Sequence, residues 1–230
     1  MSSFSYKDIY IEAGKKVLEI NVLPEKYCNF DCIFCPIGRS HNKVDMPQRF
    51  EDVEASMEIL GRLLDSGVVD LVFINSMGEA FVNDKLLDII YMIKSKGVAV
   101  RLLSNGYLLA DEKYKIIANM CDEVIGEVKA ITELDFQKLQ RPIEGYTLEE
   151  HHFNMILFNE QYTGKFILEV TIIKGYNDSD YSVSKIKGLI SMIAPDKVNI
   201  VTIDEEPFAK KLGITKERLS EISELLLDLQ

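Results

Sequence analysis

Six apolar stretches with the pattern of β-strands alternate along this chain with stretches that have the pattern of helices. The clearest is 68–75 (VVDLVFIN), which is almost continuously apolar, as expected for a buried strand of a parallel sheet. The expected strands span residues 16–22, 68–75, 98–103, 123–129, 165–174 and 197–203. The expected helices span residues 50–65, 83–96, 111–120, 132–140, 147–161, 179–193 and 214–229. This alternation predicts an α/β fold with a parallel sheet and right-handed crossovers, either an open doubly wound sheet or a barrel.

The chain is long enough to bury a sizeable core in one domain. Its 230 residues are 47% apolar and 27% charged, which is ordinary for a globular protein. No linker, low-complexity run or close repeat divides it. We therefore expect a single domain over 1–230, with a core at about 16–203 and a closing amphipathic helix at 214–229. Residues 1–14 are expected to form a short N-terminal extension, either unpaired or a partly paired strand.

Composition disfavours membrane and general nucleic-acid functions. No apolar run reaches the length of a membrane span, and the first ten residues lack a signal-peptide core, so we expect a cytoplasmic protein without a membrane partner. The formal net charge of −11 argues against a surface that coats nucleic acid. The loop 36–50 is nevertheless locally basic, with Arg39, Lys43 and Arg49 against Asp45. It is either an ordinary solvated loop or a contact for a phosphate-bearing or acidic substrate.

Three cysteines, Cys28, Cys32 and Cys35, follow the first expected strand with the spacing C-x3-C-x2-C. Three thiolates can hold three irons of a four-iron cluster and leave the fourth iron without a protein ligand. An incomplete ligand set lets a small molecule bind the metal and react there. The alternatives are a zinc site completed by His41, an electron-carrying cluster and a disulfide framework. Cys121 is distant in sequence and is expected to be a small buried apolar residue.

An aromatic residue, Phe34, directly precedes the third cysteine. The stretch thereby resembles the signature C-x3-C-x-aromatic-C of the radical S-adenosylmethionine (SAM) superfamily. The resemblance implies a partial (β/α)6 TIM-like barrel whose unclosed side admits a large substrate. It also implies that a 4Fe–4S cluster and SAM are the cofactors, and that an electron donor such as flavodoxin or ferredoxin is a partner. SAM would be cleaved reductively to methionine and a 5′-deoxyadenosyl radical, which removes hydrogen from a substrate.

Polar and glycine residues follow the second and third strands, where the resemblance implies contacts with SAM. Gly78 lets the backbone approach a ligand closely, and the carboxylate of Glu79 can accept hydrogen bonds from an ammonium group. The family often has a Gly-Gly-Glu-like turn here that holds the methionine amino group, although Met77 replaces its first glycine. Ser104 and Asn105 offer donors and acceptors suited to ribose hydroxyls, in a segment that is equally typical of a turn.

The fourth and fifth strands supply the remaining expected cofactor contacts. Glu127 and Lys129 share one face of their strand, and the resemblance places the lysine by the SAM carboxylate and the glutamate by the ribose. Ile173 and Gly175 match part of a family motif whose apolar residue packs on adenine, and Phe34 is also expected at the cofactor. The simpler reading of these residues is a solvated ion pair and an ordinary core position.

The substrate is left open by these patterns. The acidic-x-Lys pair resembles glycyl-radical-enzyme activases, whereas Lys174–Asp178 (KGYND) and Arg141-Pro142 resemble wyosine-related enzymes that modify tRNA. A small molecule, a partner protein and tRNA are all candidate substrates. His151 and His152 are expected to be surface or packing residues rather than acid–base groups. Asp204, Glu205 and Glu206 follow the last strand and either face the substrate or form a solvated turn.

Overall fold

Six parallel strands lie side by side in the order in which they occur along the chain. This computed structural model describes residues 4–40 and 42–227. The strands are β3 (Lys15–Asn21), β6 (Leu71–Ile74), β7 (Ala99–Leu103), β8 (Glu123–Val128), β9 (Lys165–Ile172) and β10 (Lys197–Thr202). A doubly wound sheet would reverse its strand order at a switch point, whereas sequential order is that of a barrel. The sheet runs from β1 (Ser5–Tyr6) to β10 without closing, so the structure is an open, partial barrel.

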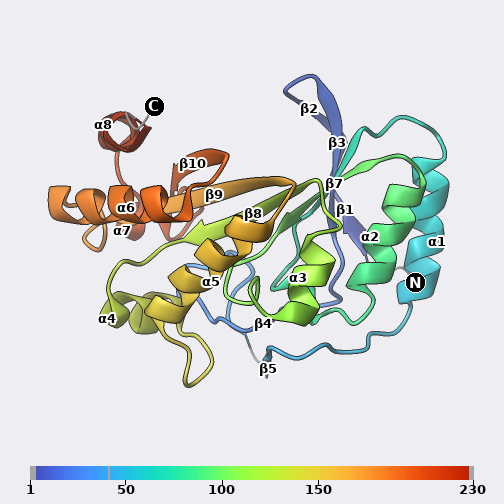
Figure 1. Ribbon diagram of the computed structural model, residues 1–230, viewed down its shortest axis with the longest axis horizontal. Coiled ribbons are helices and arrows are strands. Elements are labelled where there is room, and N and C mark those ends of the chain that lie inside the picture. The colour runs from blue at the N-terminus through green and yellow to red at the C-terminus, as the bar shows by residue number, and fades with distance from the viewer. Residues whose placement is uncertain (1–3, 41, 228–230) are drawn as a thin grey trace.

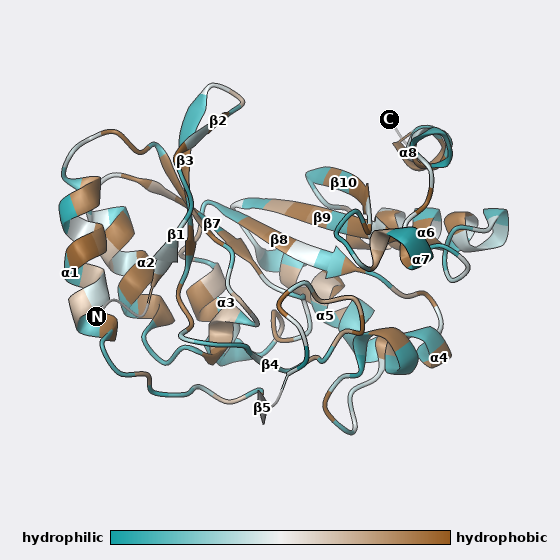
Figure 2. Cartoon of the chain, turned by 180° about the vertical axis from the view of Figure 1, so that it is seen from behind, coloured by the Kyte–Doolittle hydropathy of each residue, from teal (hydrophilic) through white to brown (hydrophobic). Residues whose placement is uncertain are grey.

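Helices connect successive strands and cover the outer face of the sheet (Figure 1). The main helices are α1 (Val53–Leu64), α2 (Leu86–Ser95), α3 (Glu112–Ala118), α5 (Leu148–Gln161), α6 (Asp180–Ile193) and α8 (Lys216–Leu227). Figure 2 shows that α1, α2 and α6 each carry both polar and apolar residues, as expected for helices that bury one side only. The six predicted strands and the predicted helix after each of them are present, which confirms the α/β prediction.

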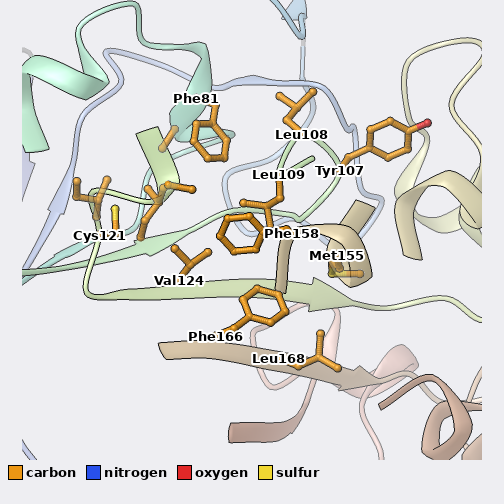
Figure 3. Packing of buried hydrophobic residues seen from close by; sticks show 14 of the residues in the cluster. Phe81, Tyr107, Leu108, Leu109, Cys121, Val124, Met155, Phe158, Phe166 and Leu168 are labelled. Atoms are coloured by element: carbon orange, nitrogen blue, oxygen red, sulfur yellow. The ribbon is translucent and has the colours of Figure 1, made fainter. Parts of the chain in front are cut away.

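Figure 3 shows part of the core, where side chains of α5 pack against β8 and β9. Phe158 of α5 packs edge-on against Phe166 of β9, with ring centroids 5.5 Å apart. The glycine Gly126 allows this approach, because a Cβ atom there would lie 2.8 Å from the Phe166 ring and 3.1 Å from the sulfur of Met155. The alternating residues of β8 that face α5 therefore belong to one continuous apolar core.

The N-terminal segment forms two short strands that pair with the sheet. β1 and β2 (Tyr10–Glu12) both pair antiparallel with β3. The turn between β2 and β3 is Ala13-Gly14, and both residues have positive φ angles, of 49° and 81°. Two-residue hairpin turns need this conformation, but the usual sequence signal for it is Asn-Gly rather than Ala-Gly. The described part of the expected extension at 1–14 is thus an added edge of the sheet.

The predicted helix at 132–140 is irregular. It consists of α4 (Glu133–Asp135) and a π-helical turn, η2 (Phe136–Gln140), and it ends at Arg141 with a φ of 44°. π-helical turns are rare and occur frequently at functional sites. Four short elements were not predicted: β4 (Tyr27–Cys28), β5 (Asn42–Lys43), η1 (Ala80–Val82) and α7 (Ala209–Leu212). Within the described residues, no helix is long and apolar enough to cross a membrane.

Removing the Phe158 side chain should destabilise the protein strongly. Phe158 is fully buried in the core, so Phe158→Ala is expected to lower the free energy of unfolding by about 3–5 kcal/mol, since it leaves a cavity. Phe153 on the same helix is 53% exposed, so Phe153→Ala should change it by about 0.5 kcal/mol or less. Urea denaturation of both variants provides the comparison. Equal effects of the two substitutions would contradict the packing described here.

Candidate functional site

The three cysteines lie on one loop and line one cavity of about 460 Å³. Cys28 ends β4, and two successive turns follow, in which Cys35 N–H donates to Cys32 O and Gly38 N–H donates to Cys35 O. The loop is tied to η2 through backbone hydrogen bonds, including one of 2.8 Å from Ile33 N–H to Leu139 O. All three thiols are free and partly buried. The structure thus presents three sulfurs to the same cavity.

The surroundings of these thiols suit a metal cluster. Burial raises the pKa of Cys28, and it raises the pKa of Cys32 to about 12, with Lys129 acting in the opposite direction. A thiolate therefore needs a compensating positive charge here, which bound iron supplies while displacing the proton. Among the described residues, no three His, Cys, Asp or Glu side chains converge on a point where they could hold a single metal ion. A four-iron cluster instead takes each thiolate at a separate corner, so the donor set fits it. His41, the predicted fourth ligand of a zinc site, lies outside the described residues.

Gly78 and Glu79 form a turn after β6 that is pressed against the cysteine-bearing strand. A Cβ atom at Gly78 would lie 1.9 Å from the carbonyl oxygen of Tyr27, so only glycine fits. Glu79 N–H donates to that same oxygen at 2.9 Å. The turn thereby brings a carboxylate to the wall of the cavity next to Cys28.

Glu79 is buried and accepts several hydrogen bonds. Its Oε2 accepts from the hydroxyl of Ser104 at 3.1 Å and from Asn105 N–H at 3.0 Å. Burial raises the pKa of Glu79 to about 7, although these two hydrogen bonds and one from Phe81 N–H lower it. The carboxylate is thus poised between its two forms, and a cationic ligand group arriving beside it would favour the ionised one.

The segment after β7 forms hydrogen bonds with both Glu79 and the cysteine loop. Asn105 lines the cavity, and its Nδ2 donates to Asn29 Oδ1 at 2.5 Å and lies 3.9 Å from Cys28 Sγ. Ser104, predicted as a ribose contact, does not line the cavity, and its hydroxyl is directed to Glu79. Asn29 is fully buried, and sequence reasoning missed it because a polar residue inside a cysteine motif gives no sign of its partner.

Glu127 and Lys129 meet at the end of β8. Lys129 Nζ lies 2.7 Å from Glu127 Oε1, and the two side chains are only 15% and 14% exposed. Burial opposes the charged form of Lys129, but Glu127, Cys32 and Glu169 outweigh it and raise the pKa of the ammonium group. Both residues line the cavity, and Lys129 also lies 5.7 Å from the centre of the Phe34 ring. The cavity is therefore lined by an ammonium group as well as by the carboxylate of Glu79.

Neither Ile173 nor Gly175 lines the cavity. Ile173 is fully buried in a small apolar cluster with Phe34 and Leu139, and of these three only Phe34 lines the cavity. Gly175 sits in a turn with a φ of 76° and donates its N–H to Asp178. Asn177, which was not singled out from sequence, is buried and bonds both the Ile173 and Lys129 backbones, joining the ends of β8 and β9.

The two histidines are packing residues in the structure. His151 is fully buried, and its Nε2–H donates to the carbonyl of Asn105 at 2.7 Å. Burial lowers the pKa of His151 to about 3 and that of His152 to about 4, so both are neutral at physiological pH. The spacing of Leu148, His151, Met155 and Phe158 along α5 is the signal that could have placed His151 on the buried side.

The remaining candidate residues divide into those that line the cavity and those that do not. Cys121 is buried away from the other cysteines, as expected. Of the three acidic residues after β10, Glu205 lines the cavity, whereas Asp204 and Glu206 do not. Of the predicted cofactor contacts, those that line the cavity with the three cysteines are Phe34, Gly78, Glu79, Asn105, Glu127 and Lys129.

Adding one methyl group at Gly78 should loosen the cysteine loop. Gly78→Ala forces the added carbon into the carbonyl of Tyr27, so we expect a loss of about 1–3 kcal/mol in the free energy of unfolding and less bound iron per chain. Gly188 is the control, because it lies within α6 with open space at its Cβ position. Gly188→Ala should stabilise the helix by about 0.5–1 kcal/mol and leave iron binding unchanged. Chemical denaturation and iron analysis of both variants test this.

Comparisons with known proteins agree with this arrangement. A family model described as the radical SAM superfamily matches residues 22–183. A "UPF0026 protein" of Helicobacter pylori is 27% identical over 215 residues, covering 90% of this chain and 68% of that protein. A "GTPase Obg" of Brachyspira hyodysenteriae is 28% identical over 187 residues, covering 80% of this chain but only 28% of that protein. The chain thus spans between about a quarter and two thirds of the length of these relatives.

Solved structures share the fold at low sequence identity. A structure described as TYW1 with a lysine-pyruvate adduct bound has a TM-score of 0.69 at 16% identity, covering 94% of this chain and 76% of that one. A radical SAM methyltransferase from Sphaerobacter thermophilus has a TM-score of 0.68 at 14% identity, with coverages of 99% and 75%. The cofactors of such enzymes are a 4Fe–4S cluster and SAM. From its family match and its fold, this chain is an enzyme that belongs to the radical SAM superfamily.

Proposed function

We propose that this protein cleaves SAM reductively to methionine and a 5′-deoxyadenosyl radical, which removes a hydrogen atom from the substrate. The observation that carries this proposal is the single cavity lined by Cys28, Cys32 and Cys35 together with oppositely charged groups. SAM has an ammonium group and a carboxylate at its methionine end. A cavity that binds this end beside iron needs one acceptor and one cation, and Glu79 and Lys129 are such a pair.

Each wall of the cavity is assigned one task in this proposal. The three cysteines hold the cluster, and when bound it supplies the electron and the open iron site. Glu79, held by Ser104 and Asn105, accepts hydrogen bonds from the methionine ammonium group. Lys129, held by Glu127, faces the carboxylate. Because both side chains are positioned by their neighbours before SAM arrives, little reorganisation is needed on binding.

The nucleoside end is assigned to side chains that adjoin Glu79 and Lys129 in the cavity wall. Asn105 and Glu127 offer polar atoms to the ribose, and Phe34 offers an apolar surface to adenine. Ile173 contributes by packing behind Phe34, and Gly175 by shaping the turn after β9. Keeping water away from the reacting carbon is the task of the apolar cluster around these residues.

For the second half of the reaction, wyosine-type modification of a tRNA base is the first candidate. Supporting it are the Lys174–Asp178 and Arg141-Pro142 segments, which resemble those of wyosine-related enzymes. Activation of a glycyl-radical enzyme has weaker support, because a domain of a pyruvate-formate lyase-activating enzyme from Bacteroides vulgatus matches 62% of this chain at a TM-score of 0.50. Addition of bulk tRNA to the assay below separates these candidates, since only the first expects stimulated turnover.

The proposed cleavage is tested by anaerobic reconstitution with iron and sulfide, chemical reduction and chromatography for 5′-deoxyadenosine. Native protein should form this product, and Cys32→Ala should form none, because the cluster loses one of its three ligands. Cys121→Ala is the matched control and should retain the native yield, since Cys121 is buried elsewhere. Equal yields from native protein and Cys32→Ala would refute the cluster assignment.

Replacing Lys129 should weaken the binding of SAM without loss of iron. Lys129→Met keeps the length of the side chain and removes its charge, so we expect the dissociation constant of SAM to rise about tenfold or more, as for the loss of a hydrogen bond to a charged group. Equilibrium dialysis gives the affinity, and iron analysis shows whether the cluster is retained. Lys174→Met, at an exposed position after β9, is the control. An unchanged affinity in Lys129→Met would remove this residue from the site.

A further inference from the structure

Three cations gather on the cysteine loop and the segment that packs against it. Arg39 holds the carboxylate of Asp31 with two nitrogens, at 2.6 and 2.8 Å. Arg141 approaches the same carboxylate oxygen at 3.9 Å, although it lies far away in sequence. Lys43 donates to the carbonyl of Pro142 at 2.9 Å. We refer to Arg39, Lys43 and Arg141 as the loop patch.

The loop patch is rigidly connected to the cluster ligands. Asp31 lies directly before Cys32, and its N–H donates to Gln140 O at 3.0 Å. A β-bridge joins Phe30 to Pro142, so the loop and the segment after η2 form one continuous surface. Arg39 comes directly after the turn that runs from Cys35 to Gly38. Any molecule that binds the loop patch therefore lies within a few residues of a cluster ligand.

The loop patch lies outside the cavity. Cys35 and Pro36 line the cavity, whereas Arg39, Lys43 and Arg141 do not. The guanidinium side chains of Arg39 and Arg141 are 63% and 40% exposed, while the Asp31 side chain that orients them is buried. A substrate that is to lose hydrogen to the radical has to enter the cavity. The loop patch therefore does not contact the reacting group, and it is accessible to a molecule that approaches the cluster from outside the cavity.

The sign of the charge identifies the chemistry of that molecule. The chain has a formal net charge of −11, so its overall field repels acidic proteins. The three cations outnumber the one buried carboxylate that the two arginines contact, Asp31, so this surface is locally positive and favours the approach of an acidic partner. The two arginines are already oriented by Asp31, so they lose less side-chain freedom on binding than free arginines. A tRNA backbone is a poorer fit, because three cations neutralise few phosphates on an otherwise acidic protein.

We propose that the loop patch is the docking surface for an acidic one-electron carrier protein that reduces the cluster. This inference rests on the proposed function, which requires one electron for each SAM cleaved. The reduced carrier loses one electron, the oxidised cluster gains it, and no proton or bond changes hands between the two proteins. Because electron transfer slows steeply with distance, docking beside Cys35 and Cys32 brings the carrier to the nearest ligands of the cluster.

The test compares two reductants and includes a binding measurement. Lys43→Glu and Arg141→Glu are combined in one variant, which leaves the Arg39–Asp31 contact intact. With reduced flavodoxin at low salt, the double variant should form 5′-deoxyadenosine at least about tenfold more slowly than native protein, whereas with dithionite the two should agree within about twofold. Oxidised flavodoxin should bind native protein about tenfold more tightly than the variant, with an affinity that falls as salt rises.

Arg62→Glu provides the matched control, because Arg62 is 69% exposed on α1, which lies apart from β5 (Figure 1). It should change neither the flavodoxin-driven rate nor the affinity. Equal flavodoxin binding and equal rates for native protein and the double variant would overturn the docking surface while leaving SAM cleavage intact. A fall with both reductants would also overturn it, since the substitutions would then act on the cluster or on SAM cleavage itself rather than on docking. Flavodoxin binding that is lost in the double variant, without any 5′-deoxyadenosine from native protein, would instead contradict the proposed function and still support the docking surface.

Discussion

A single backbone contact holds the site together: the carbonyl oxygen of Tyr27 accepts the N–H of Glu79 while Gly78 passes beside it without a side chain. This contact joins the loop after the first barrel strand to the turn after the second one. From it, Glu79 reaches Ser104 and Asn105 after the third strand, and Asn105 returns to Asn29 in the cysteine loop. The ends of three neighbouring strands are thereby coupled through one buried carboxylate.

The other half of the cavity is built from charge rather than from backbone contact. Lys129 is kept in an apolar setting because Glu127 lies 2.7 Å away, and Asn177 bonds the Lys129 carbonyl to the end of β9. Neutralising only one member of such a pair leaves the other buried without a partner. The pair therefore depends on both residues, which explains why two charges occupy the end of a strand that otherwise faces the core.

Much of this architecture follows from local sequence patterns. Most of the parts that could not be predicted have one cause in common, which is tertiary packing. The six strands and their helices are readable because each buries an apolar face with a regular period. The Ala13-Gly14 hairpin was not predictable because its sequence lacks the usual turn residues. The irregularity of the helix at 133–140 was not predictable because its end at Arg141 depends on the cysteine loop that packs against it. Cavity residues are predictable where a strand simply ends, as at Glu127 and Lys129. Ser104 and Ile173 could not be placed, because which neighbour a side chain meets is decided by tertiary packing.

The π-helical turn η2 has a consequence for how this loop changes over evolutionary time. It leaves the carbonyl groups of Leu139, Gln140 and Arg141 free to accept hydrogen bonds from Asp31 and Ile33. These bonds run between main-chain atoms, so they do not depend on which side chains occupy either segment. The two segments can therefore diverge in sequence while the ligand geometry persists. Single-residue insertions or deletions in this turn, rather than substitutions, are the changes to which iron binding is most vulnerable.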